Sequence, residues 1–200
     1  IIPAEHLIAA PGFIDLHVHL REPGADNKET IKSGLDAAAN GGFTSVVCMP
    51  NTNPDIDDVT VVEYINSKAK GFLTDVLVSA AITKQRAGKS ITNMLSLNES
   101  GVVMFTDDGV AVSNSEVMKL AFDYSAPQDL LLAQHCEDHS LTKGFTMNES
   151  TLSYRLGLKG YPTIAEEIIL SRDIMLAEYC GNRRYHAQHI STKGAVELIR

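Results

Sequence analysis

The sequence has few of the features that mark secreted or membrane proteins. Only three of its 200 residues are cysteines, and Cys48, Cys136 and Cys180 are far apart and form no Cys-x-x-Cys pair. This spacing excludes a disulfide framework and a cysteine zinc site, and it favours a cytoplasmic location. No apolar run is long enough to cross a membrane, and no signal peptide is visible.

A run of basic residues is also missing. Acidic residues outnumber basic ones by 25 to 17, for a formal net charge of −8. This balance argues against a nucleic acid or an anionic membrane as partner. With 44% hydrophobic and 21% charged residues, the composition is that of a soluble globular protein.

The length of the chain bounds its domain organisation. We expect residues 1–200 to form one domain, or a part of one. The sequence opens at Ile-Ile-Pro and closes within an expected helix. We therefore expect it to be a portion of a longer protein of about twice this length, the usual size of the fold predicted below.

Apolar runs and helical patterns alternate along the chain. The predicted strands cover residues 13–20, 44–49, 75–82, 102–105, 130–134 and 184–190. The predicted helices cover residues 28–40, 58–70, 92–98 and 162–179, with one more capped by Ser113 or Ser115 and a last one capped by Ser191 or Thr192. The polar stretch 142–160 is predicted to be an insertion that lies over the mouth of the site.

Six strand–helix units in series predict a parallel sheet with right-handed crossovers. An open doubly wound sheet and a (β/α)8 barrel both satisfy this pattern. The first strand is not followed by Gly-x-Gly-x-x-Gly, which weakens a dinucleotide-binding fold. Polar residues instead follow several different strands, as they do in the active sites of barrels. We expect an α/β protein of the (β/α)8 TIM-barrel type, of which this chain supplies about six units.

Two histidines, His17 and His19, lie near the end of the first predicted strand. Side chains at positions i and i+2 of a strand share a face, so both can reach one metal ion. Arg21 is expected on the same face, one pleat further on. An apolar strand rarely contains two histidines without a reason, which favours metal binding over two histidines of the core.

Further candidate ligands follow other strands. Asp107 and Asp108 follow the fourth strand, and His135 ends the fifth. His189 and His186 compete on the sixth, because an offset of three places them on opposite faces of a strand. Taken alone, the two aspartates are more typical of an ordinary turn than of a metal site, and His135 is equally typical of a core or capping histidine.

Together these residues exceed what one structural site needs. Histidine and carboxylate ligands suit zinc and similar ions, and two ions bridged by a carboxylate and a hydroxide would use them all. The histidines are assigned in two pairs, His17 with His19 and His135 with His189. Asp108 is assigned as the bridge and Asp107 is the alternative, because both lie in the same turn.

Five blocks of the sequence resemble, in the same order, blocks of one family. They are Asp15-Leu-His-Val-His-Leu-Arg-Glu-Pro23, Met49-Pro-Asn-Thr-Asn-Pro54, Phe105-Thr-Asp-Asp-Gly109, His135-Cys-Glu-Asp138 and His189-Ile-Ser-Thr192. The first resembles the amidohydrolase signature as it occurs in dihydroorotases, and the set spans essentially the whole chain. The chain resembles a type I dihydroorotase. The resemblance implies reversible hydrolysis of dihydroorotate to N-carbamoyl-L-aspartate, in pyrimidine biosynthesis.

The resemblance also implies a role for each matching residue. The ligands of two zinc ions, bridged by Asp108 and a hydroxide, would be His17, His19, Asp108, His135 and His189. Arg21 and Asn51 would hold the carboxylate of a small-molecule substrate. No residue of this chain would be the general acid/base, because the family's aspartate for that role follows the eighth strand and is expected beyond residue 200. The expected partner is a second copy of the chain or a transcarbamoylase.

Two other functions stay open at this point. One is a non-catalytic scaffold, although such relatives tend to lack the metal histidines and all four are present here. The other is a related cyclic amidohydrolase, such as a hydantoinase or an allantoinase. Relatives of that kind use a carboxylated lysine as the bridge, whereas no lysine stands near Asp108 in its block.

Overall fold

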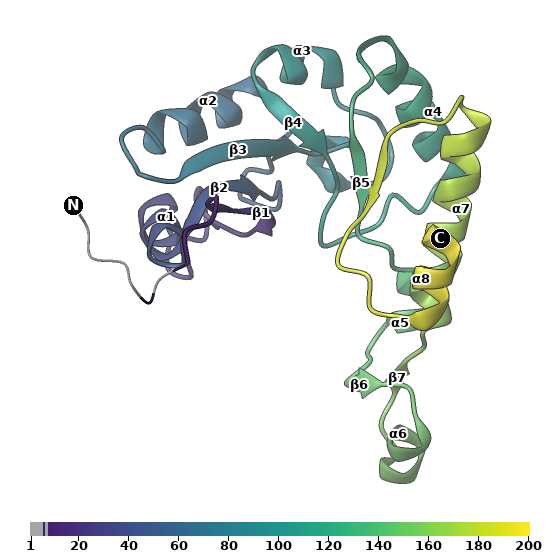
Figure 1. Cartoon of the computed structure of the whole chain (residues 1–200). Helices are drawn as coiled ribbons and strands as arrows, with labels where there is room; N and C mark the ends of the chain where they lie inside the picture. Colours follow the sequence, from purple (N-terminus) through teal and green to yellow (C-terminus); the bar gives the residue numbers. More distant parts are fainter. Residues whose placement is uncertain (1–5, 7) are drawn as a thin grey trace.

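One curved sheet of six parallel strands forms the centre of the computed structural model, which describes residue 6 and residues 8–200. The strands are β1 (Phe13–Val18), β2 (Phe43–Cys48), β3 (Asp75–Ala80), β4 (Val102–Phe105), β5 (Leu132–Gln134) and β8 (Tyr185–Ala187). They lie in the order β1-β2-β3-β4-β5-β8, and each neighbouring pair is parallel. Helices follow the outside of the curve (Figure 1). The predicted α/β fold with six units of a barrel wall is confirmed.

The helices begin close to the predicted positions. They are α1 (Ile31–Asn40), α2 (Val59–Lys68), α3 (Met94–Glu99), α4 (Ser115–Ser125), α7 (Ile164–Tyr179) and α8 (Lys193–Ile199), with short 3-10 turns η1 (Lys84–Arg86) and η2 (Ala126–Gln128). The N-cap of α4 is Asn114, so the predicted cap at Ser113 or Ser115 was wrong. The carboxamide oxygen of asparagine reaches the free N–H groups of a first turn as well as a serine hydroxyl does. Thr192 caps α8, one of the two predicted alternatives.

Successive side chains of a strand point to opposite faces of the sheet, so the strands contribute to two separate buried clusters. Val46 and Cys48 of β2 face outward and pack in one cluster with Ile31 and Leu35, which lie one turn apart on α1. The residues that alternate with them face the inner side, in a second buried cluster formed by Val47, Met49, Met104 and Ala133. The inner face of the sheet is therefore apolar below the ends of the strands.

The first strand is shorter than predicted. β1 ends one residue before His19, and the chain turns at Arg21, whose φ of 60° lies in the left-handed region. The backbone N–H of Glu22 bonds to the carbonyl oxygen of Leu20 at 2.7 Å. The alternation of a strand therefore stops before Arg21, and the expectation that strand geometry places it on the face of the two histidines was wrong.

The polar stretch between β5 and α7 folds into a small lobe. It contains α5 (His139–Thr142), β6 (Met147–Asn148), α6 (Thr151–Leu156) and β7 (Gly160–Tyr161), and β6 pairs with β7 in a separate two-stranded sheet. Figure 1 shows this lobe projecting away from the large sheet. It is an insertion, as predicted, but it does not fold over the sheet in this structure, so a role as a lid stays a prediction.

Within the part of the chain that the structure describes, β1 and β8 are the two open edges of the large sheet. On β1, the side chains of Phe13, Ile14 and Leu16 are 59%, 61% and 52% exposed. Exposed apolar side chains next to an unpaired strand edge favour association with another element. Among the described residues, no helix combines the length and the hydropathy needed to cross a bilayer.

Candidate metal centre

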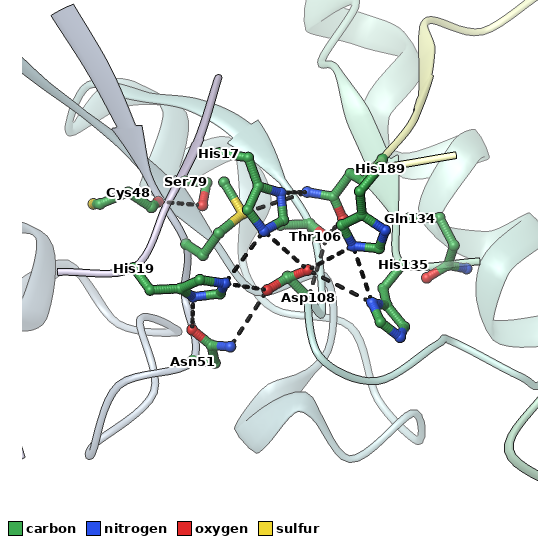
Figure 2. A network of polar contacts seen from close by, with 12 residues as sticks. His17, His19, Cys48, Asn51, Ser79, Thr106, Asp108, Gln134, His135 and His189 are labelled. Atoms are coloured by element: carbon green, nitrogen blue, oxygen red, sulfur yellow. Dashed lines mark hydrogen bonds and ion pairs between the residues drawn. The ribbon is translucent and has the colours of Figure 1, made fainter. Parts of the chain in front are cut away.

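Four histidines and one aspartate meet at the carboxyl ends of the strands, and Figure 2 shows them around the carboxylate of Asp108. Oδ1 of Asp108 lies 3.5 Å from Nε2 of His17 and 3.5 Å from Nε2 of His189. The same oxygen lies 3.8 Å from Nδ1 of His135. The second oxygen, Oδ2, lies 3.6 Å from Nε2 of His19. Histidines from three strand ends, those of β1, β5 and β8, thus converge on the carboxylate that follows β4.

The histidines are arranged in two pairs. Nε2 of His17 lies 3.3 Å from Nε2 of His19, and Nδ1 of His135 lies 3.1 Å from Nε2 of His189. The ligand atoms of each pair and of Asp108 all lie within 4.8 Å of one another. Because Asp108 belongs to both groups, the structure brings together the five residues that the sequence singled out, in the predicted pairs.

The donor set fits first-row divalent metal ions. Imidazole nitrogen and carboxylate oxygen are the donors that zinc and its neighbours take in proteins. One oxygen of Asp108 is nearest to His19, and the other faces the remaining three histidines. A carboxylate in this position can offer one oxygen to each of two ions. The five residues could therefore hold two ions side by side.

Two alternatives from the sequence lie outside this cluster. The carboxylate of Asp107 accepts the backbone N–H of Thr83 at 2.9 Å and also its hydroxyl. Burial raises the pKa of Asp107 to about 6, against the effect of these hydrogen bonds. His186 lies within β8 and contributes no atom to either group of ligands. His189 joins the cluster because the backbone turns after β8, where His189 has a φ of 33°.

The charges of the site suit metal ligands. Burial disfavours ionisation of Asp108, but hydrogen bonds from His17 and His189 outweigh it and hold the pKa of Asp108 well below its usual range. Burial lowers the pKa of His19, and the charge of Arg21 adds to this effect. An ionised carboxylate and a neutral imidazole are the forms that bind a metal ion. The pKa of His189 is raised, chiefly by its hydrogen bond to Asp108, so a proton competes with a metal at that ring.

Asn51, from the loop after β2, orients two of these side chains. Its Oδ1 accepts a hydrogen bond from Nδ1 of His19 at 2.9 Å, and its Nδ2 donates to Oδ2 of Asp108 at 3.3 Å. The Nε2 atom of His19 is then left facing the cluster. A partner of this kind fixes the tautomer and the orientation of a ligand histidine.

Glu137 has the same relation to His135. The Nε2–H group of His135 donates to Oε2 of Glu137 at 2.8 Å, which leaves Nδ1 for the cluster. The other oxygen of Glu137 accepts the hydroxyl of Thr142 and lies 3.1 Å from Nδ1 of His139, both on α5. His139 is exposed to solvent on its other side. The small lobe is thus tied to the site through Glu137.

Backbone contacts hold the turn that presents Asp108. Nη1 of Arg86 donates to the carbonyl oxygen of Asp108 at 2.9 Å, and Nε of Arg86 pairs with Asp55 at 2.7 Å. The hydroxyl oxygen of Thr106 accepts the backbone N–H of Asp108 at 3.1 Å. These contacts hold the chain on both sides of the carboxylate, so the carboxylate is positioned by elements far away in the sequence.

The loops after β1 and β2 pack against each other, which brings Arg21 and Asn51 to the same side of the site. The backbone N–H of Asn53 donates to the carbonyl oxygen of Pro23 at 3.0 Å. Gly24 has a φ of 96°, and a Cβ atom there would lie 2.2 Å from the carbonyl oxygen of Asn53. Only glycine allows this approach.

Sequence reasoning found Asn51, but as a substrate-binding residue, and it missed Glu137, Gln188 and Arg86. Glu137 stands two residues after His135 and Gln188 directly precedes His189, but no periodicity distinguishes them from ordinary polar residues. Arg86 lies in η1, far from every block that was singled out. The proximity of Glu137 and Gln188 to ligands was the one available signal, and Arg86 gave none.

Comparisons with known proteins place the chain in a family. A profile of the family described as "Dihydro-orotase-like" matches residues 6–195. The dihydroorotase of Thermoanaerobacter sp. (strain X514) is 48% identical over 201 residues, and that of Aquifex aeolicus (strain VF5) is 49% identical over 200. Both alignments cover 100% of this chain but only 46% and 47% of the relatives. The chain thus spans about half the length of the curated relatives it matches.

Solved structures share the fold at lower sequence identity. L-Hydantoinase (dihydropyrimidinase) from Arthrobacter aurescens matches with a TM-score of 0.75 at 19% identity, covering 94% of this chain and 44% of that one. Dihydroorotase in complex with 5-fluoroorotic acid from Saccharomyces cerevisiae matches with a TM-score of 0.65 at 19% identity, covering 94% and 50%. From the profile match and the near-50% identity of its curated relatives, we conclude that the chain belongs to the dihydroorotase-like family.

Proposed function

We propose that the protein is a metal-dependent dihydroorotase, which interconverts dihydroorotate and N-carbamoyl-L-aspartate. The position of Asp108 between two histidine pairs carries this proposal, since the active sites of barrel enzymes lie at the carboxyl ends of the strands. The names of relatives at 48% and 49% identity support dihydroorotate as the substrate. The position between the two histidine pairs is held by an aspartate, whereas hydantoinases and allantoinases use a carboxylated lysine as the bridge. This difference also supports dihydroorotate as the substrate.

The five ligands would hold two zinc or zinc-like ions. His17, His19 and Asp108 would bind one ion, and Asp108, His135 and His189 the other. Such ions, when bound, polarise an amide carbonyl and supply a water nucleophile that is active at neutral pH. The surrounding residues would keep the ligands in place, with Asn51 on His19 and Glu137 on His135.

Arg21 and Asn51 are proposed to receive the carboxylate of the substrate. Arg21 is half-buried beside His19, and its planar guanidinium offers two parallel N–H donors to a carboxylate. Asn51 uses both amide atoms on His19 and Asp108 here. A contact with substrate would therefore be made in addition to its role in orienting His19, or in exchange for one of these bonds.

The general acid/base of the reaction is proposed to come from the half of the relatives' length that this chain does not span. Proton transfer by such a group contributes about two to four orders of magnitude in rate.

We also propose a cytoplasmic location and a role in pyrimidine biosynthesis. The proposed assembly is a homo-oligomer or a complex with a transcarbamoylase.

The test uses the full-length protein with dihydroorotate, hydantoin and allantoin as substrates. We expect hydrolysis of dihydroorotate alone, two zinc ions per chain, and loss of both metal and activity in His17→Ala. Turnover of hydantoin or allantoin instead would assign the protein to another cyclic amidohydrolase. Fewer than one zinc ion per chain, unchanged in His17→Ala and with no turnover, would make it a scaffold.

A further inference from the structure

One buried side chain at the centre of the site has no role in the function proposed above. Gln188 directly follows β8, and only 1% of its surface is exposed. Its backbone N–H donates to the carbonyl oxygen of Gln134 at 3.1 Å, which extends the pairing of β8 with β5 by one residue. The side chain therefore leaves the backbone from a fixed point.

The amide of Gln188 reaches from one edge of the sheet to the other. Its Nε2 lies 3.3 Å from Nδ1 of His17, near the end of β1, and 3.3 Å from Sδ of Met49. Its Oε1 accepts the hydroxyl of Thr106 at 2.9 Å, and Thr106 in turn accepts the backbone N–H of Asp108. A continuous chain of polar contacts thus joins His17 to the turn that presents Asp108.

The two nitrogens of His17 face different partners. Nε2 lies 3.5 Å from Oδ1 of Asp108 and points into the cluster (Figure 2), whereas Nδ1 faces Gln188. A neutral imidazole that binds a metal ion through Nε2 carries its proton on Nδ1, and this N–H group, which faces the buried Gln188, needs an acceptor. The side-chain oxygen of Gln188 can be that acceptor if the amide turns over.

The surroundings allow the amide to turn. The terminal torsion of a glutamine side chain is broad, and exchanging its oxygen and nitrogen leaves the shape of the group unchanged. The hydroxyl of Thr106 can donate to the amide oxygen or accept from the amide nitrogen, so it pairs in both orientations. The contact that would be lost is the one to the thioether of Met49, which is a weak acceptor.

We propose that Gln188 is a positioning residue for His17, whose Nδ1–H group donates to the amide oxygen of Gln188 so that Nε2 is held toward Asp108 as a metal donor. Asn51 has the same relation to His19, and Glu137 to His135. The inference rests on the proposed metal centre. Gln188 would contact neither the substrate nor the metal ion, and it would act through the metal-binding residue His17.

The test measures zinc affinity in the full-length protein by competition with a chromophoric chelator. Gln188→Met removes the acceptor at similar volume and should weaken the ion held by His17 and His19 about 10- to 100-fold, the usual effect of losing such a partner. Gln188→Glu keeps an acceptor and should bind zinc at least as tightly as the parent. Gln134→Met is the matched control, because it replaces an equally buried glutamine that contacts Val112 and Asp173 but no histidine side chain.

A second measurement reads the contact directly, without a variant. Nitrogen-15 spectra of histidine-labelled, zinc-loaded protein should show His17 with its proton on Nδ1 and slow exchange of that proton with water. Gln188→Met should speed this exchange, and Gln188→Glu should not. Equal zinc affinities in the parent and in Gln188→Met, or an Nδ1 proton of His17 that exchanges freely in the parent, would overturn the inference and leave the metal centre intact. A parent protein that binds no zinc would overturn both.

Discussion

At the scale of single residues, the structure separates two neighbouring aspartates with different tasks. Asp108 faces four histidines, whereas Asp107 bonds to Thr83 on the opposite side of the same turn. Burial raises the pKa of Asp107 to about 6, so the neutral form costs little and an asparagine can replace it. The two side chains can therefore be tested against each other.

We expect Asp108→Asn to reduce the zinc content of the full-length protein from two ions to fewer than one per chain. The rate of dihydroorotate hydrolysis should fall about 100-fold or more, because metal ions supply several kcal/mol of transition-state stabilisation. Asp107→Asn is the control and should keep both ions. Elemental analysis and a kinetic assay measure these effects, and equal metal contents in the two variants would contradict the assignment of Asp108.

Arg21 is the second residue with a distinct prediction. Replacing it by lysine would remove the proposed bidentate contact with a substrate carboxylate while keeping the positive charge. We expect KM for dihydroorotate to rise about 10- to 100-fold, the value of a hydrogen bond to a charged group. Zinc content should not change. Arg155→Lys in α6, on the separate lobe, serves as the control, and an unchanged KM in Arg21→Lys would refute the predicted contact.

At the scale of secondary-structure elements, a buried carboxylate joins α7 to the sheet. Asp173 is fully buried and accepts hydrogen bonds from Arg172 at 2.6 and 2.8 Å, from Gln134 of β5 at 3.0 Å and from Tyr185 of β8 at 3.0 Å. Arg172 also donates to two backbone carbonyl groups between β4 and α4. The network thus connects the longest helix with the strands that precede His135 and His189.

We expect Asp173→Ala to lower the free energy of unfolding by about 3–5 kcal/mol, because it leaves buried partners without an acceptor. Urea unfolding of the full-length protein measures this change. Asp123→Ala is the matched control, since it breaks an exposed ion pair with Lys119 on α4 and should have little effect. Similar losses of unfolding free energy in the two variants would show that the buried network stabilises the protein no more than an exposed ion pair does.

A second carboxylate, Glu22, ties the loop after β1 to two helices. It accepts the backbone N–H of Ile31 in α1 at 2.9 Å and the hydroxyl of Tyr64 in α2 at 2.7 Å, and it pairs with Lys68 at 3.4 Å. Burial opposes ionisation of Glu22, but these three donors together lower its pKa below the usual value of 4.5. The loop that presents Arg21 therefore depends on an ionised Glu22.

This pKa shift predicts a pH dependence of stability. A carboxyl group whose pKa is lower in the folded state stabilises the protein above its unfolded pKa of about 4.5, and this contribution is lost as the pH falls through the folded value. Glu22→Gln should therefore be less stable than the parent at pH 7, and the difference should shrink below about pH 4.5. Tyr64→Phe, which removes one donor, should show a smaller effect of the same sign. Parallel stability curves for the parent and Glu22→Gln would speak against this linkage.

At the scale of the whole molecule, the open sheet exposes apolar side chains along one edge. Expressed alone, the 200 residues should self-associate through β1, because an unpaired edge strand with exposed Phe13, Ile14 and Leu16 favours pairing with another chain. Light scattering after size-exclusion chromatography measures the mass. Leu16→Lys should shift the chain toward the monomer, whereas Leu73→Lys, which replaces a 91% exposed leucine away from the edge strands, should not. A monomeric parent chain would be evidence against this prediction.

The sequence by itself determined the class of fold and the set of candidate ligands. Apolar runs alternating with helical patterns report local backbone geometry, which is why the parallel sheet and the outer helices could be predicted. His17 and His19 could be predicted as a pair because residues two apart in an extended segment point the same way. His135 and Asp108 were found because polar residues at the end of an apolar strand are uncommon.

Only the tertiary structure decided which of several neighbouring residues faces the site. Asp108 rather than Asp107 enters the cluster because Thr83 occupies the other side of the turn. Arg21 leaves the plane of β1, and His189 enters the cluster, because the backbone turns where each strand ends. Such choices depend on contacts between residues far apart in the sequence, as the bond between Gln188 and His17 across 171 residues illustrates. Periodicity within a segment contains no information on these contacts.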